Sequence, residues 1–196
     1  MRHFLRLSIL LIGLFSGSSS FAADTLPPVN TADDLGPQVD QPIEFPHNRH
    51  AKDMGINCMY CHTYARRAPV AGIPPLQKCM GCHNGIESVK DKPRIKELFK
   101  HWDEKKPIAW KKVHDLPDYV RFNHERHVKR FIVQQDKPVQ EVCGYCHGDV
   151  KEGTVARRQK PLSMGWCVSC HEKAHPTDKT AQATAQGPND CWQCHK

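Results

Sequence analysis

The stretch CMYCH, running from Cys58 to His62, decides the fold of this chain. Two cysteines three positions apart, followed at once by a histidine, suit half of a zinc site, a redox dithiol or an attachment point for haem. The same CxxCH pattern returns at residues 79–83, 143–147, 167–171 and 191–195. These five motifs use all ten cysteines of the 196-residue chain.

The histidine after each second cysteine separates these explanations. Cysteines that form disulfides have no reason to carry it, and zinc ribbons use CxxC units in pairs, whereas five is an odd number. In c-type haem attachment, two thiols bond to the vinyl groups on one edge of the porphyrin, and the next residue offers an imidazole to the iron. We therefore expect five haem c groups. The attaching residues are Cys58, Cys61, Cys79, Cys82, Cys143, Cys146, Cys167, Cys170, Cys191 and Cys194, and the proximal ligands are His62, His83, His147, His171 and His195.

The composition favours a fold that is completed by these cofactors. The chain holds 15 prolines and 12 glycines, and 39% of its residues are hydrophobic. So many helix and strand breakers do not favour long regular elements, so the flat apolar porphyrins would supply much of the core. We expect mainly irregular loops with short α-helices wrapped around five covalently bound haems, duplicated modules, and little or no β-sheet.

The first 22 residues have the layout of a secretory signal peptide. Arg2 and Arg6 precede an apolar run at residues 7–15, and small residues stand at positions 20 and 22. This run is about half of the ~20 residues that cross a bilayer, although an N-terminal membrane anchor is the alternative. We therefore expect export to the periplasm and no transmembrane segment in the mature chain.

The charge of the chain fits bound haem better than nucleic acid. The formal net charge is +7, and removal of Arg2 and Arg6 leaves 7 − 2 = +5. The haem propionates would offset much of this excess, in the sense that a bound group's own charge belongs in the balance. We expect redox partner proteins and no nucleic acid.

A repeated phrase supplies candidates for the second axial ligand of each iron. Besides His3 and the five motif histidines, the chain contains seven more, and four of them lie in an FxHxRH phrase at residues 45–50 and 122–127. Two histidines three apart on one helical turn point in similar directions, so they reach two neighbouring haems and not one iron. The seven are His47, His50, His101, His114, His124, His127 and His175.

The repeat extends beyond this phrase and predicts the organisation of the chain. An Ala-Arg-Arg triplet follows each copy, at residues 65–67 and 156–158, and Pro-Leu precedes the next CxxCH motif. Such self-similarity indicates a duplicated module. We expect a signal peptide (1–22), a flexible mature N-terminus (23–40), a dihaem module (41–86), a helical connector (87–117) and a trihaem module (118–196). Within the connector, a helix over residues 93–105 would bury a stripe of apolar side chains and leave His101 facing solvent.

The FxHxxH phrase ahead of CxxCH resembles the class III multihaem cytochromes c, which are small trihaem and tetrahaem electron carriers. In that family the first histidine of the phrase caps the following haem and the second caps another, and trihaem members place a further ligand between their last two motifs. The resemblance implies these distal and proximal pairs: His47 with His62, His50 with His83, His124 with His147, His127 with His171, and His175 with His195.

Two alternatives for these ligands stay open. His114 is a sixth candidate for five places and would replace His50 or His175. Met54, Met80 and Met164 are possible iron ligands, although the supply of histidines makes packing against porphyrin the preferred role for them.

A longer resemblance covers most of the mature chain. The phrases at residues 113–120 (VHDLPDYV), 122–127 (FNHERH) and 164–171 (MGWCVSCH) look like the pentahaem subunit of alternative complex III and the related multihaem subunit of menaquinone reductase complexes. That resemblance implies work beside a quinol-linked membrane complex.

The ligand supply predicts electron transfer and not catalysis. With a distal histidine for each of five haems, every iron is six-coordinate and has no place for substrate. We expect a periplasmic cytochrome that passes electrons between redox partners, such as a periplasmic reductase. The alternatives are a haem-bearing subunit of a membrane quinol-oxidising complex and a multihaem reductase with one open iron.

Overall fold

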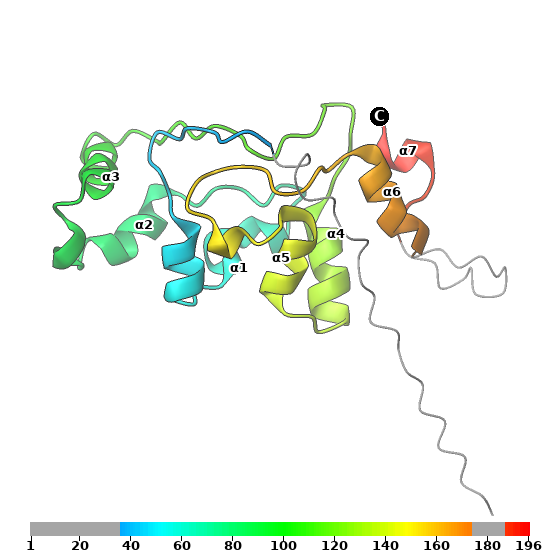
Figure 1. Cartoon of the computed structure of the whole chain (residues 1–196), viewed down its shortest axis with the longest axis horizontal. Helices are drawn as coiled ribbons and strands as arrows, with labels where there is room; N and C mark the ends of the chain where they lie inside the picture. The colour runs from blue at the N-terminus through cyan, green and yellow to red at the C-terminus, as the bar shows by residue number, and fades with distance from the viewer. Residues whose placement is uncertain (1–35, 174–186) are drawn as a thin grey trace, which may run out of the picture.

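The computed structural model describes residues 36–173 and 187–196, and within them the chain consists of short helices joined by irregular segments (Figure 1). These residues form no β-strand, and their only β-type pairings are two isolated bridges, Gln38 with Arg157 and Val120 with His195. The fold class predicted from the sequence is thus confirmed. The α-helices are α1 (Cys58–Cys61), α2 (Leu76–His83), α3 (Pro93–Asp103), α4 (His124–Val128), α5 (Val139–His147), α6 (Met164–Lys173) and α7 (Cys191–Cys194).

Five further helical turns of 3-10 or π geometry lie between the α-helices. The π turns are η1 (Asn48–Asp53) and η4 (Lys129–Gln134), and each directly follows the histidines of one FxHxRH phrase or overlaps them. The 3-10 turns are η2 (Thr63–Arg66), η3 (Glu87–Val89) and η5 (Val150–Glu152).

Every CxxCH motif forms a helical turn, and local signals start these turns. The Asn57 side chain accepts a hydrogen bond from the Met59 N–H at 2.9 Å, which caps the N-terminus of α1. Asp190 caps α7 in the same way through the Gln193 N–H at 3.1 Å. Such caps satisfy backbone donors that a short helix leaves free. Each pair of cysteines therefore lies three positions apart on one helical turn.

A small hydrophobic core lies where α2 meets α3. Ile43, Met80 and Leu98 are buried there, and the apolar stripe of α3 packs around them through Ile95, Phe99 and Trp102. The stripe predicted from the sequence is confirmed, and Met80 has a packing role. Lys105 adopts a φ of 54°, a left-handed conformation that follows the helix end at Asp103, two residues earlier than predicted.

Few hydrophobic side chains are buried elsewhere in the described part of the chain. Besides the α2–α3 cluster, only Ala65, Val128 and Val142 belong to the buried hydrophobic set, and no polar or charged residue is buried. The remaining segments thus lack a side-chain core of their own. This is the packing expected of a chain that folds around large apolar cofactors.

Backbone hydrogen bonds connect the two repeated halves in both directions, and these contacts are called the exchange below. Asn48, within the first FxHxRH phrase, donates its N–H to the Gly153 carbonyl of the second half at 3.0 Å. His124, in the second phrase, donates its N–H to the Pro69 carbonyl of the first half at 3.1 Å. Each phrase is therefore anchored on the loop of the opposite half. Residues 36–39 extend the exchange, because Gly36 and Val39 bond to the backbone at residues 158 and 156.

The helices are spread along the longest axis of the molecule. From one end to the other, Figure 1 shows α3 and α2, then α1, then α5 with α4, and finally α6 and α7. No described helix is long and apolar enough to cross a membrane.

Candidate haem sites

Three of the distal candidates face a motif histidine at a separation that suits one shared metal ion. The ring centroids lie 6.2 Å apart for His50 and His83, 6.2 Å for His124 and His147, and 6.1 Å for His127 and His171. Two imidazoles on opposite sides of one metal, with metal–nitrogen bonds of about 2 Å, have centroids roughly 6 to 6.5 Å apart. The His124 and His147 rings are also nearly parallel, with an interplanar angle of 6°. The residues present thus fit an iron bound between two imidazoles.

Backbone carbonyls orient many of these imidazoles. An Nδ1–H that donates to a carbonyl leaves Nε2 as the metal-binding nitrogen and fixes the ring orientation. Five motif or distal histidines have Nδ1 within 3.0 Å of a carbonyl oxygen. The pairs are His50 with Pro46, His62 with Gly72, His124 with Pro69, His127 with Asn123, and His171 with Pro188.

Burial keeps these side chains in the neutral form that coordinates metals. Burial lowers the pKa of His47 to about 4 and the pKa of His147 to about 3. It also lowers the pKa values of His83, His114 and His127. A neutral imidazole is the ligand form, so no proton has to be removed from these groups near neutral pH.

His101 differs from these histidines in what its ring contacts. Its Nε2 lies 3.6 Å from a carboxylate oxygen of Glu97, one turn earlier on α3, and its Nδ1 lies 3.3 Å from the Lys106 carbonyl. The side chain is 20% exposed, so it is more covered than its position off the apolar stripe predicted. Both ring nitrogens thus contact groups of α3 or of the segment directly after it.

Burial lowers the pKa of His47 most, and the charges of His62, His50 and His114 lower it further, so His47 lies in the neighbourhood of His62. His114 lies next to His147, with ring centroids only 4.4 Å apart and planes at 82°. That separation is too short for the two rings to bind one metal from opposite sides. The Nε2 atom of His114 is buried and has no hydrogen-bond partner.

At the last CxxCH motif, the structure describes the motif itself but not the segment at residues 174–186. His195 stacks on the ring of Tyr119 at 5.8 Å, and the Val120–His195 bridge ties the motif to the start of the second half. His175, the distal candidate for this motif, lies outside the described residues.

Two arginines of the repeated Ala-Arg-Arg triplet, Arg157 and Arg158, add positive charge near the candidate haem sites. The Nε atoms of Arg157 and Arg158 are buried and have no hydrogen-bond partner. Arg158 also lies close enough to His114 for its charge to lower the pKa of that histidine, after the larger effect of burial. A guanidinium with a buried, unsatisfied donor is costly unless an anion pairs with it, and a haem propionate beside His147 would do so. The repeated Ala-Arg-Arg triplet was the signal for this role.

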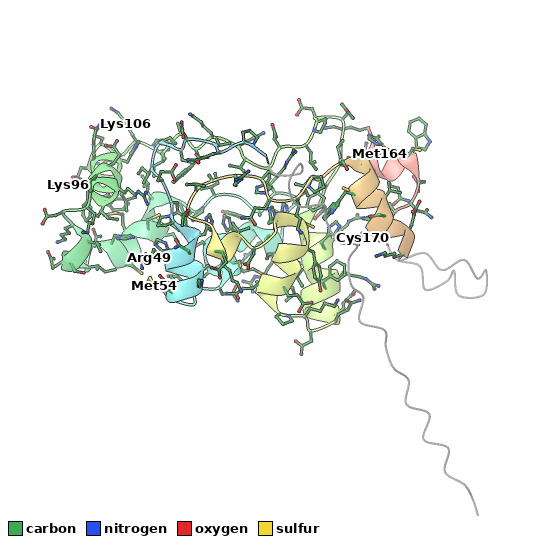
Figure 2. All side chains as sticks on the ribbon, viewed as in Figure 1. Arg49, Met54, Lys96, Lys106, Met164 and Cys170 are labelled. Carbon is green, nitrogen blue, oxygen red and sulfur yellow. The ribbon has the colours of Figure 1, made fainter. Side chains whose placement is uncertain are left out.

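We expect Arg158→Gln to lower the reduction potential of one haem. Loss of a cation favours the more positive oxidised iron, by on the order of 30–60 mV, where about 59 mV is a tenfold change in a one-electron equilibrium. Spectroelectrochemical titration measures the shift. Arg49→Gln is the matched control, because the Arg49 side chain is 73% exposed and pairs with Asp53 at 3.1 Å (Figure 2). Equal titration curves for both variants and the wild type would contradict the propionate role.

Comparisons with known proteins agree with this chemistry. Residues 26–108 match the model of the class III cytochrome C family. Over 170 aligned residues, the chain is 26% identical to a protein named "Menaquinone reductase, multiheme cytochrome c subunit" from Nitratidesulfovibrio vulgaris (strain Hildenborough). The alignment covers 81% of this chain and 78% of that relative. Cytochromes of this kind bind haem c covalently and carry electrons. The repeated CxxCH motifs, the paired imidazoles and these two similarities support a multihaem cytochrome c that is similar to the class III family.

Proposed function

We propose that this chain is a periplasmic electron-transfer cytochrome that carries five haem c groups, each with two axial histidines. The observation that carries the proposal is the separation of 6.1 to 6.2 Å in three imidazole pairs, each joining a motif histidine to a histidine of an FxHxRH phrase. An iron held between two imidazoles changes oxidation state without an open position for substrate. The protein itself therefore transfers electrons and catalyses no substrate conversion.

The proposed ligand sets follow the ring separations of the histidines that the structure describes. Three sets are the measured pairs of His50 with His83, His124 with His147 and His127 with His171, and His47 beside His62 makes a fourth. For the fifth we propose His175 with His195. The CxxCH cysteines fix each haem edge, and the carbonyls that accept from Nδ1 hold the imidazoles in place.

We propose that the partner is a quinol-linked membrane complex. The support is the named role of the relative, which is a subunit of a menaquinone reductase. The protein would receive electrons from such a complex, or deliver them to it, on the periplasmic side. The signal-like segment at residues 1–22, which lies outside the described residues, supports export. A free carrier that serves a periplasmic reductase has the same haem chemistry, and purification of the native assembly distinguishes the two.

The stoichiometry tests the proposal directly. Because each of the ten cysteines belongs to a CxxCH motif, the matured chain is expected to carry five covalent haems. Intact mass spectrometry after export, together with a pyridine haemochrome assay, counts them. A fully matured protein with four haems or fewer would refute the proposal.

Charge reversal on α3 is expected to slow electron exchange with an acidic partner. Lys96 and Lys100 are 64% and 60% exposed, and Lys105 directly after the helix is exposed too. Their contacts with Asp91 and Glu97, at 3.6 and 3.5 Å, are exposed ion pairs that stabilise little, so the lysines are available to a partner.

Replacing these three lysines by glutamate should lower the second-order rate roughly tenfold or more at low ionic strength, and the difference should shrink as salt is added. Stopped-flow kinetics with the purified partner complex measures it. Lys129→Glu, at an exposed position of η4, is the control. Equal rates for the triple variant and the wild type at low salt would remove α3 from the docking surface.

A further inference from the structure

A tyrosine stands between the cysteines of the first CxxCH motif in each repeated half, and a lysine covers each of these two rings. The ammonium nitrogen of Lys78 lies 4.4 Å from the ring centroid of Tyr60. The ammonium nitrogen of Lys137 lies 5.2 Å from the ring centroid of Tyr145. Both distances suit a cation–π contact, which attracts an ammonium group to an aromatic face. Each of these motifs therefore has a positive charge beside its haem-attaching cysteines.

The two lysines come from different places in the repeat. Lys78 lies on α2, directly before Cys79 of the second motif, whereas Lys137 lies between η4 and α5. At the position that matches Lys78, directly before Cys167, the second half has Trp166. The tyrosine is thus repeated in the two halves, but the lysine that covers it is not.

A carboxylate offsets one of these lysines and not the other. Lys137 donates to the Tyr145 hydroxyl at 3.1 Å, and this hydroxyl donates in turn to the carboxylate of Glu141. Among the residues that the structure describes, no carboxylate forms an ion pair with Lys78. The pair of Lys137 and Glu141 is therefore neutral as a whole, whereas the charge of Lys78 is not offset.

The charge of Lys78 reaches an attaching cysteine of the first motif. Burial raises the pKa of the Cys61 thiol, and the ammonium group of Lys78 opposes this rise because it favours the thiolate. Both side chains are half-buried, so water and salt screen their interaction less than they would at an exposed position. A cation that favours negative charge at the attachment point also favours the reduced iron, because the reduced haem carries one positive charge less than the oxidised haem.

We propose that Lys78 raises the reduction potential of the haem on the first motif and so makes this haem a preferred site for an electron. Lys78 acts through its charge and not as a ligand. The haem on the third motif gains no such preference from its own lysine, because Glu141 offsets Lys137. In the step itself, one electron passes from a reduced redox protein to the ferric iron, which becomes ferrous, and no bond forms or breaks. This inference rests on the proposed function, and it adds a residue that sets how electrons are distributed in the protein.

A redox titration of the holoprotein, followed by nuclear magnetic resonance of the haem substituents, tests the proposal. The first-motif haem is recognised by its contacts with the Tyr60 ring, and the third-motif haem by its contacts with the Tyr145 ring. In Lys78→Gln, we expect the reduction equilibrium of the first-motif haem to shift towards the oxidised form by roughly threefold to tenfold, where tenfold is about 59 mV for one electron. Lys78→Arg should restore the wild-type potential, because a guanidinium group keeps both the charge and the cation–π contact.

The matched control removes both members of the neutral pair in the second half. The double variant Lys137→Gln, Glu141→Gln should change the reduction equilibrium of the third-motif haem by less than about twofold, because the two lost charges cancel. An unchanged first-motif potential in Lys78→Gln, or an equal shift in Lys78→Arg, would overturn the proposal if the protein carries five haems. Failure of the proposed function would look different, because mass spectrometry would then count fewer than five haems in the wild type.

Discussion

His124→Ala is expected to convert one of the five haems from low-spin to high-spin, with binding of carbon monoxide in the reduced state, while the other four stay low-spin. The His124 ring lies parallel to His147 at 6.2 Å, and its Nδ1 is held at 2.7 Å by the Pro69 carbonyl. Alanine removes one axial ligand and leaves the iron five-coordinate or bound to water. All five haems should remain attached, because attachment uses only the CxxCH cysteines.

Electron paramagnetic resonance of the oxidised protein and carbon monoxide difference spectra of the reduced protein measure this change. The matched control is His101→Ala, since His101 is also a partly covered helical histidine but faces Glu97. It should leave all five haems low-spin. A low-spin spectrum in His124→Ala would show that another group, with His114 as the nearest candidate, binds that iron.

The features predicted correctly from the sequence depend on local or covalent signals. Each CxxCH motif is complete within five residues and forms a helical turn, while its role in haem attachment stays a prediction from the chemistry of the motif. A helix over residues 93–105 was predicted from Pro93 at its start and from its apolar stripe, and the structure confirms the start and the stripe but ends the helix at Asp103. The loop-and-helix fold followed from the number of prolines and glycines.

The features that the sequence did not reveal depend on contacts between distant segments. The repeat predicted two modules, but not that the backbone of residues 36–48 would pair with residues 153–158 while His124 bonds to Pro69. Side-by-side copies and exchanged copies have the same sequence pattern. The contact between α1 of the first half and α5 of the second half is another pairing that the sequence pattern did not predict. Arg157 and Arg158 were visible as a repeat, but their unpartnered Nε atoms are a property of the fold.

The exchange also bears on how the modules fold. The first FxHxRH phrase is anchored on Gly153, and Lys52 of the turn after it pairs with Glu152 of the second half. A dihaem module cut at residue 86 would lose these contacts as well as the small core between α2 and α3, because Leu98 lies beyond the cut. The predicted boundaries at residues 41–86, 87–117 and 118–196 therefore describe repeats in the sequence. We do not expect them to be units that fold independently.

His175→Ala is expected to open the iron of the last haem and leave the other four low-spin. The resemblance to the trihaem class III cytochromes implies a distal ligand between the last two motifs, and His175 lies there. His50, His124 and His127 each face another motif histidine, and His47 lies beside His62. Only His114 and His175 then remain for this site.

The position of His114 separates these two candidates. The ring centroid of His114 lies 4.4 Å from that of His147 of the third motif, whereas the last motif forms α7, which lies next to α6 at the end of the molecule opposite α3 (Figure 1). We therefore expect His114→Ala to keep all five haems low-spin and to change the environment of the third haem alone, seen as a shift of its potential. In His175→Ala, the reduced protein should bind one carbon monoxide per chain, at the haem whose resonances contact Trp192. If His175→Ala stays fully low-spin while His114→Ala binds carbon monoxide at that haem, His114 is the ligand, and the loop at residues 113–118 must reach the last motif in the haem-loaded protein.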